Sequence, residues 1–337
     1  MVGLTRRLRD ATPGLLALVG LAVVAAVIHT VVPAINRLIV AVVLGALVVN
    51  LLGVPAWARA GVDTQERPLE AGIVLMGTRI PFEVLAERGP TVVLPGVATV
   101  LFTLGVSEAL GTRVFEVPDR ASSLLASGAA ICGVSAVIAV AGGIDARRDQ
   151  IALAVGSVVV LDVVTLFLFP VVGSLLALPD QVFGIWAGLS MYSTGPVLAA
   201  GFTYSGTAGE WATITKLIRN ALIGVAVMGY ATLYARRRAG REESSRSLAS
   251  IWRDFPAFVL GFVALVGVAN TGIIPAAQLA TLQTASEWLF VVAFVGVGME
   301  LDRDVLETTS LRPMAVAVSS LLIVSVASLA VVSMVFG

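Results

Sequence analysis

The sequence predicts an all-α membrane protein, and three observations lead to this fold class. Of the 337 residues, 58% are hydrophobic and only 13% are charged, whereas soluble domains carry roughly 25% charged residues. The mean hydropathy is +0.96. The apolar residues gather in about 11 stretches, each long enough to cross or deeply enter a bilayer core about 30 Å thick. We therefore expect one integral membrane transporter domain over residues 1–337, without a soluble domain.

Charged residues, prolines and glycines separate these stretches. In chain order they cover residues 13–32, 35–54, 68–86, 90–111, 120–142, 150–178, 181–204, 210–235, 255–273, 285–301 and 311–336. The first follows an arginine-rich N-terminus without a small-x-small cleavage site, so we expect a retained span rather than a signal peptide. The longest hydrophilic connection is a basic loop over residues 236–254.

Lysine and arginine gather in loops that stay in the cytoplasm, and this bias predicts orientation. The N-terminal arginines and the basic loop 236–254, which follows an even number of segments, both predict a cytoplasmic N-terminus in the cell membrane. Arg147 and Arg148 would lie outside the cytoplasm, against this bias, if segment five crossed the membrane fully. Either this loop breaks the rule, or segments five and seven are both re-entrant.

Segments five and seven are rich in glycine, serine and threonine at residues 126–136 and 187–196. Small residues allow close helix packing; alternatively, they form a discontinuous helix whose free N–H groups hold an anion. Pro196 favours the second interpretation because an interior proline removes a helix hydrogen bond. The candidate substrate-binding residues here are Ser127, Gly128, Cys132, Gly133, Ser135, Tyr192, Ser193 and Thr194.

Three charged residues lie well inside predicted spans, where each costs about 2.5–3.5 kcal/mol to insert. Asp162, near the middle of 150–178, is either a carboxylate that couples transport to a proton or Na⁺, or a buried carboxyl bonded to a neighbouring helix. Lys216 and Arg219 lie three residues apart on one face of segment eight. We expect them to face inward, where they would neutralise a substrate dianion or bind Asp162.

The remaining charged and reactive residues exclude several function classes. Glu108, Glu287 and Glu300 lie near segment ends and are expected to be solvated. One cysteine and one histidine exclude a disulfide and a Cys/His metal site, so no cofactor is expected beyond a coupling ion. Because acidic and basic residues are equal in number, the chain has no net positive charge that would attract nucleic acid. Catalytic motifs are absent from the sequence, so we do not expect an enzyme.

Two stretches resemble each other across the chain. Residues 72–79 and 294–301 both run from apolar residues into a Gly-x-charged end, seven segments apart and hence oppositely oriented. An inverted repeat produces such a pair of similar, oppositely oriented stretches. Two glycine-containing spans can also match by chance.

The motif Ile131-Cys132-Gly133-Val134-Ser135-Ala136, together with Lys216-Leu217-Ile218-Arg219, resembles the YeiH-like sulfate exporter family of bacteria and archaea. Phe183 to Gly188, Val197 to Gly201 and the glycine pattern that ends at Arg79 are also similar to it. The resemblance implies the fold of the cation/anion transporter superfamily, with inverted repeats, unwound helices and sulfate export. Many members carry an ionisable pair where this chain has Tyr192-Ser193, so the resemblance implies that Asp162 or a sodium ion couples transport here instead.

Together these residues predict a secondary transporter that exports a small inorganic oxyanion such as sulfate by alternating access around a midplane site. Its partners would be the anion, the bilayer and a second copy in a homo-oligomer. The alternatives are a Na⁺/H⁺-type antiporter that uses Asp162, and a non-transporting membrane receptor or assembly subunit.

Overall fold

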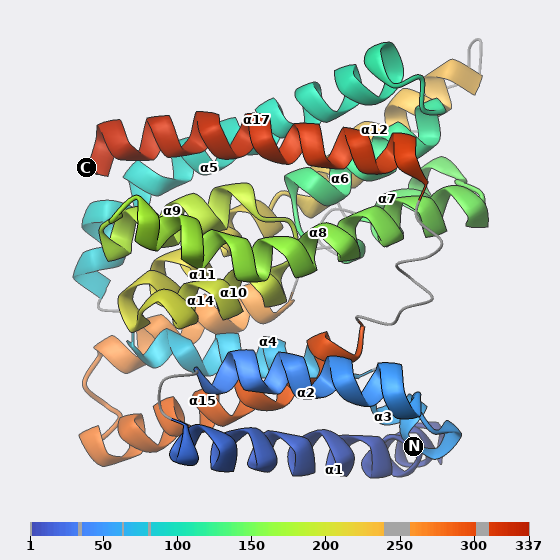
Figure 1. Ribbon diagram of the computed structural model, residues 1–337. Helices are drawn as coiled ribbons and strands as arrows, with labels where there is room; N and C mark the ends of the chain where they lie inside the picture. Colours follow the sequence, from blue (N-terminus) through green and yellow to red (C-terminus); the bar gives the residue numbers. More distant parts are fainter. Residues whose placement is uncertain are drawn as a thin grey trace. The chain divides into compact units, whose positions relative to one another are not determined.

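The computed structural model describes residues 2–32, 36–62, 64–79, 82–238, 257–300 and 310–336. Every regular element within these ranges is a helix (Figure 1), as the composition predicts. Six helical stretches are long and apolar enough to cross a membrane: Ala11–Val31, Thr91–Val114, Arg148–Leu175, Gly206–Arg236, Ala276–Met299 and Leu311–Phe336. Most of the predicted basic loop, from residue 239 onward, lies outside the described residues.

The chain divides into two compact units, and each combines two stretches that are distant in sequence. Unit 1 comprises Met1–Glu87 and Ala257–Arg303, and unit 2 comprises Arg88–Pro256 and Asp304–Gly337.

Unit 1 is built from six α-helices and one short 3₁₀ helix in the described ranges. They are α1 (Val2–Val31), α2 (Arg37–Leu52), α3 (Ala56–Val62), α4 (Glu66–Met76), η1 (Gly77–Arg79), α14 (Ala257–Asn270) and α15 (Ala276–Met299). The short helix α3 was not expected from the sequence. Helix α15 begins at residue 276 rather than at the predicted residue 285, because its polar first turns continue the helix beyond the apolar run.

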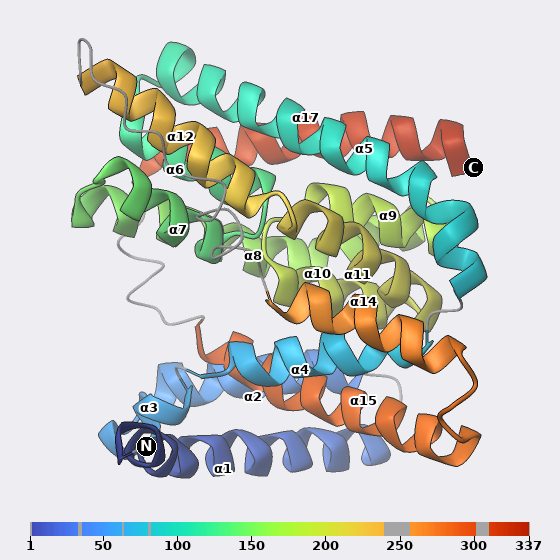
Figure 2. The same ribbon diagram turned by 180° about the vertical axis from the view of Figure 1, so that it is seen from behind.

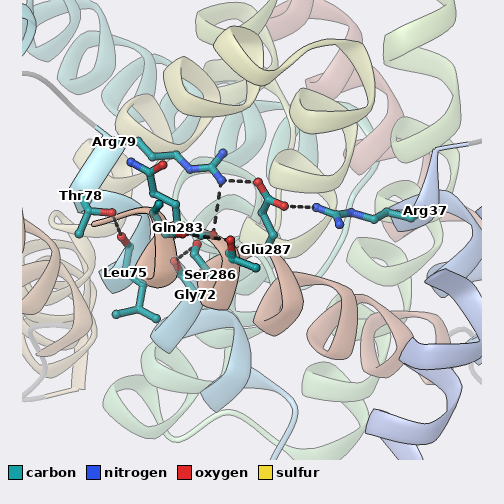
Figure 3. A network of polar contacts seen from close by, with 10 residues as sticks. Arg37, Gly72, Leu75, Thr78, Arg79, Gln283, Ser286 and Glu287 are labelled. Atoms are coloured by element: carbon teal, nitrogen blue, oxygen red, sulfur yellow. Dashed lines mark hydrogen bonds and ion pairs between the residues drawn. The ribbon is translucent and has the colours of Figure 1, made fainter. Parts of the chain in front are cut away.

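Helix α15 packs against both α2 and α4, and glycines set the distance to α2. A Cβ atom on Gly45 would lie 3.0 Å from the Cα atom of Gly298 and even closer to the carbonyl oxygen of Val295. The two backbones are therefore in direct contact, as in small-residue packing between membrane helices. Glu287 of α15 is not simply solvated: it pairs with arginines at the start of α2 and the end of η1 (Figure 3).

Unit 2 contains the remaining elements, with the first turn of α5 in unit 1. They are α5 (Phe82–Ala109), the π-helical turn η2 (Leu110–Val114), α6 (Asp119–Ala130), α7 (Val134–Ile144), α8 (Arg148–Leu175), α9 (Asp180–Ser190), α10 (Thr194–Tyr204), α11 (Gly206–Asn220), α12 (Ile223–Arg238) and α17 (Leu311–Phe336). Segments five, seven and eight of the sequence prediction are thus each two helices, α6–α7, α9–α10 and α11–α12. Segment three, predicted over residues 68–86, is also interrupted, because it comprises most of α4, then η1 and the first residues of α5.

Replacing Gly45 or Gly298 with valine should lower the free energy of unfolding by about 2 kcal/mol, because the new side chain has to push two backbones apart. The measurement is thermal unfolding of the purified protein in detergent. Gly20→Val in α1 is the matched control, since nothing lies within 4 Å of its Cβ position while the cost of valine in a helix is the same. Equal unfolding temperatures for the three variants would contradict the proposed contact.

Candidate functional site: the tips of two helical hairpins

Helices α9 and α10 form a hairpin whose tip is Met191 to Ser193. Regular helix stops at Ser190 and resumes at Thr194. The end of α10 lies beside the start of α9, where the ring of Tyr204 stacks on that of Phe183 with the two ring centroids 3.9 Å apart. The Tyr204 hydroxyl also donates to the carbonyl oxygen of Leu178 at 2.6 Å. Both ends of this hairpin therefore lie together, near the C-terminal end of α8.

Helices α6 and α7 form a second hairpin, with its tip at residues 131–133. The start of α6 and the end of α7 both pack on the last turns of α12, and the three helices lie together in Figures 1 and 2. The Ser123 hydroxyl of α6 is 3.0 Å from that of Tyr234. A Cβ atom on Gly143 of α7 would lie 3.5 Å from the Cβ atom of Ala231, which is one helical turn before Tyr234 on α12.

Helix α8 connects the two hairpins and brings their tips together. Its 28 residues extend about 42 Å at 1.5 Å per residue, so the hairpins begin at opposite ends of α8 and their tips meet near its middle. The amide of Ser193 donates to Asp162 Oδ1 at 3.0 Å. A Cβ atom on Gly133, whose φ is +68°, would lie 3.0 Å from the Cβ atom of Ser193. The two tips are therefore in contact, and only glycine fits at this point.

Two cations of α11 bind the carbonyl groups that the hairpin tips leave open. The fully buried guanidinium of Arg219 donates to the carbonyl oxygens of Ala129 and Ala130 at the end of α6, at 2.5 and 2.9 Å. It also donates to Gly188, Leu189 and Met191 at the end of α9, at 2.7–2.8 Å. Lys216, equally buried, donates to Met191 at 3.0 Å and to Tyr192.

This geometry has a clear electrostatic reason. A helix C-terminus carries roughly half a negative charge and up to four carbonyl groups without partners. Two such ends meet here inside the protein, and burying them unpaired would cost several kcal/mol. Both cations face inward, as the sequence predicts, but most of their donors bind backbone carbonyl groups rather than remaining open for a substrate.

The helix N-termini at the tips differ from each other. At α10, the Asp162 carboxylate accepts from the Ser193 amide and so compensates the positive end. At α7 the N-cap residue is Gly133, which has no side chain with which to cap the first turn. Ser135 in that turn is exposed. The N-terminus of α7, with Ser135 exposed in its first turn, is therefore the helix end at the tips that can offer N–H groups to an anion.

The predicted binding residues separate into two groups. Cys132, Ser193 and Thr194 are half-buried and Ser135 is exposed, so these four line the accessible side of the tips. Ser127, Gly128, Gly133 and Tyr192 are buried. The Ser127 hydroxyl donates to the Leu124 carbonyl at 2.8 Å, and the Tyr192 hydroxyl donates to the carbonyl of Ala317 on α17 at 2.7 Å.

Helix α17 supports α9 and the tip of the α9–α10 hairpin. Besides Tyr192, the Trp186 indole donates to the carbonyl oxygen of Ser325 at 2.9 Å, and the hydroxyls of Ser190 and Ser328 lie 2.8 Å apart. These bonds fix α9 and its tip against the last helix of the chain.

Two polar residues of α11 were missed by the sequence analysis. Asn220 donates to the Thr194 hydroxyl at 3.1 Å. Its Oδ1 atom and the Thr215 hydroxyl are buried and without hydrogen-bond partners in the described part of the chain, which is unusual for buried polar atoms. Both residues flank Lys216 and Arg219 in sequence, and this proximity was the available signal.

Comparison with known proteins places this architecture in a family. The family model described as Conserved hypothetical protein 698 matches residues 13–317. The chain belongs to this family. It is 30% identical to a UPF0324 membrane protein of Bradyrhizobium diazoefficiens, over 89% of this chain and 84% of the relative. No solved structure matches it significantly.

Two further relatives carry the same name. The chain is 30% identical to one from Agrobacterium fabrum, over 79% of this chain and 74% of the relative. It is 29% identical to one from Clostridium tetani, over 74% and 75%. Together with the six long apolar helices, these relatives identify a multi-pass membrane protein.

Replacing Arg219 with glutamine should lower the free energy of unfolding by about 3 kcal/mol or more, because several buried carbonyl groups lose their charged donor. Arg219→Lys should fall between this variant and the wild type, since it keeps the charge but cannot reach both hairpins. Thermal unfolding in detergent measures the difference.

Arg147→Gln is the matched control for this prediction, because it removes an exposed ion pair with Asp149. The expected change is below about 1 kcal/mol. An Arg219→Gln variant as stable as Arg147→Gln would show that the tips do not depend on the guanidinium.

Proposed function

We propose that this protein is a secondary transporter that moves a small inorganic oxyanion, such as sulfate, across the cell membrane by alternating access. The observation that carries the proposal is the meeting of two hairpin tips at the middle of α8, where the N-terminus of α7 begins at a glycine N-cap and carries exposed Ser135 in its first turn. Broken helices that meet near the bilayer midplane are the usual form of a transporter binding site.

The anion would bind at the N-terminus of α7. The first-turn N–H groups and the Ser135 hydroxyl are the donors, with Ser193 across the contact between the tips. Two basic side chains, Lys216 and Arg219, face the single carboxylate of Asp162 at the tips. In this arrangement Arg219 is a positioning residue: it holds both tips, and the backbone of α7 binds the anion.

In the membrane, the two hairpins would be re-entrant and enter from opposite faces. Nine crossings plus two hairpins then account for the eleven apolar segments of the sequence. This topology places Arg147 and Arg148 in the cytoplasm with the N-terminus and with Arg236, which agrees with the positive-inside rule. The opposite entry of the two hairpins is also the relation expected of an inverted repeat.

Sulfate is the first substrate to test, because the chain resembles a sulfate exporter family in the Ile131 to Ala136 motif and in Lys216 to Arg219. The chemistry at the tips selects a compact anion that accepts several hydrogen bonds. Sulfite, thiosulfate and bicarbonate share these properties and belong in the same assay.

Counterflow of radioactive sulfate in proteoliposomes tests the proposal. Ser135→Ala should reduce the initial rate about tenfold, the loss expected for one charge-assisted hydrogen bond of about 1.4 kcal/mol. Gly133→Ala should abolish transport because the methyl group would separate the tips. Gly142→Ala in α7 should behave like the wild type, since nothing lies within 4 Å of its Cβ position. Transport of none of the four anions, or an active Gly133→Ala variant, would refute the proposal.

The second candidate function is a cation antiporter, which the buried carboxylate of Asp162 near the tips favours. Substitution of Asp162 distinguishes this antiporter from the anion transporter. With anion transport, Asp162→Asn should keep sulfate exchange but lose uptake driven by a pH or Na⁺ gradient, because the coupling charge is gone. Parallel measurement of internal pH with a fluorescent dye decides between the two. Proton movement driven by Na⁺ without any anion would establish the antiporter instead.

A further inference from the structure

Unit 1 contains a second group of charges, well separated in sequence from the hairpins. The carboxylate of Glu287 on α15 lies between two arginines (Figure 3). Its Oε2 atom is 2.6 Å from Nη2 of Arg37, the first residue of α2, and its Oε1 atom pairs with Nη2 of Arg79, the last residue of η1. Two guanidinium groups from different helices thus share one carboxylate, one oxygen atom each.

The charges in this group do not balance. Two arginines and one glutamate leave one net positive charge. In addition, Nε of Arg79 is buried and has no acceptor in the described part of the chain, and the bond from Nη2 of Arg79 to the carbonyl oxygen of Gln283 is long, at 3.4 Å. A buried charged donor without an acceptor is costly, so the group has capacity for another anionic oxygen.

The group can be reached from outside unit 1. The side chains of Arg37, Arg79 and Glu287 are 32%, 21% and 37% exposed. Glu287 lies where α15 enters the packed part of the unit: residues 276–281 before it are mostly exposed, whereas Ser286 and Phe290 are buried. Ser286 also donates to the carbonyl oxygen of Gly72 at 2.7 Å, which anchors α15 to α4 at this level.

We propose that Arg37 and Arg79 form a binding site for a tetrahedral oxyanion of the sulfate or phosphate class, and that the Glu287 carboxylate is the internal occupant that such an anion displaces. Arginine binds carboxylates and tetrahedral oxyanions through the same planar donors. An incoming sulfate offers more oxygen atoms than a carboxylate, so it can bridge both guanidinium groups and also reach Nε of Arg79. Being more than a third exposed, Glu287 can turn to solvent.

This site does not depend on transport at the hairpin tips, because all its residues belong to unit 1. A free anion and the phosphate of a lipid headgroup share the required chemistry. A purely structural ion pair is the competing explanation, and it predicts no response to either anion.

The test is protection of the two arginines from phenylglyoxal, an arginine-specific reagent, with the modified peptides quantified by mass spectrometry. The full-length protein is held in nanodiscs of phosphatidylcholine and titrated with inorganic sulfate in gluconate buffer. Glu287→Gln, which removes the internal occupant and keeps the side-chain shape, should bind sulfate more tightly than the wild type. At about ten times the half-saturating concentration, sulfate should slow labelling of Arg79 about tenfold by mass action.

Two controls keep the test specific. Arg147, which forms an exposed one-to-one pair with Asp149, should be labelled at the same rate with and without sulfate. Arg37→Gln leaves Arg79 and Glu287 as a neutral pair, so sulfate should no longer protect Arg79 in this variant, and the prediction can be examined even if Glu287→Gln does not fold.

Replacing phosphatidylcholine with phosphatidylglycerol identifies the source of the anion. Protection by sulfate in the neutral lipid supports a free anion, and protection by phosphatidylglycerol without sulfate supports a lipid phosphate. If neither slows labelling of Arg79 in the wild type or in Glu287→Gln, the site does not exist. Because the readout is local, this result would leave the proposed transport function untouched.

Discussion

The arrangement of unit 2 depends on one interaction, the capping of two buried helix ends by Arg219. A helix that stops inside a protein leaves carbonyl groups that water cannot reach, and α6 and α9 both stop at the same place. A single guanidinium group reaches the carbonyls of both because its donors lie in one plane and point in different directions. Once these ends are fixed, the starts of α7 and α10 are fixed as well, and with them the position of the open N–H groups.

Both units pack helix backbones closely through glycines. In unit 1, Gly45 and Gly298 bring α2 and α15 together, and in unit 2, Gly184 and Gly188 bring α9 against α11. Unit 2 differs because helices also end in its interior, where the side chain of Arg219 satisfies the open backbone carbonyl groups. Interrupted helices of this kind are tolerated at membrane depth where protein or a water-filled cavity surrounds them.

The sequence predicted where the two helices are interrupted, but it did not predict that the chain folds back into a hairpin after each interruption. Glycine, serine and threonine at residues 126–136 and 187–196 indicated the two breaks correctly, because these residues favour interruptions. Pro196 lies in the first turn of α10, where a proline is tolerated, so it starts a helix rather than kinking one. The return of each hairpin could not be predicted, since it depends on contacts such as Tyr204 with Phe183. Glu287 pairs with Arg37, 250 positions away, and local patterns carry no information about such a partner.

The bonds between α9 and α17 have a consequence for how the protein is made. Trp186, Ser190 and Tyr192 bind backbone or hydroxyl groups of a helix that begins at Leu311. A nascent chain emerges from the ribosome N-terminus first, so more than a hundred residues are inserted before these polar groups meet their partners. The α9–α10 hairpin is therefore made without its partners on α17, and its polar contacts form only after Leu311 and the residues that follow have been synthesised.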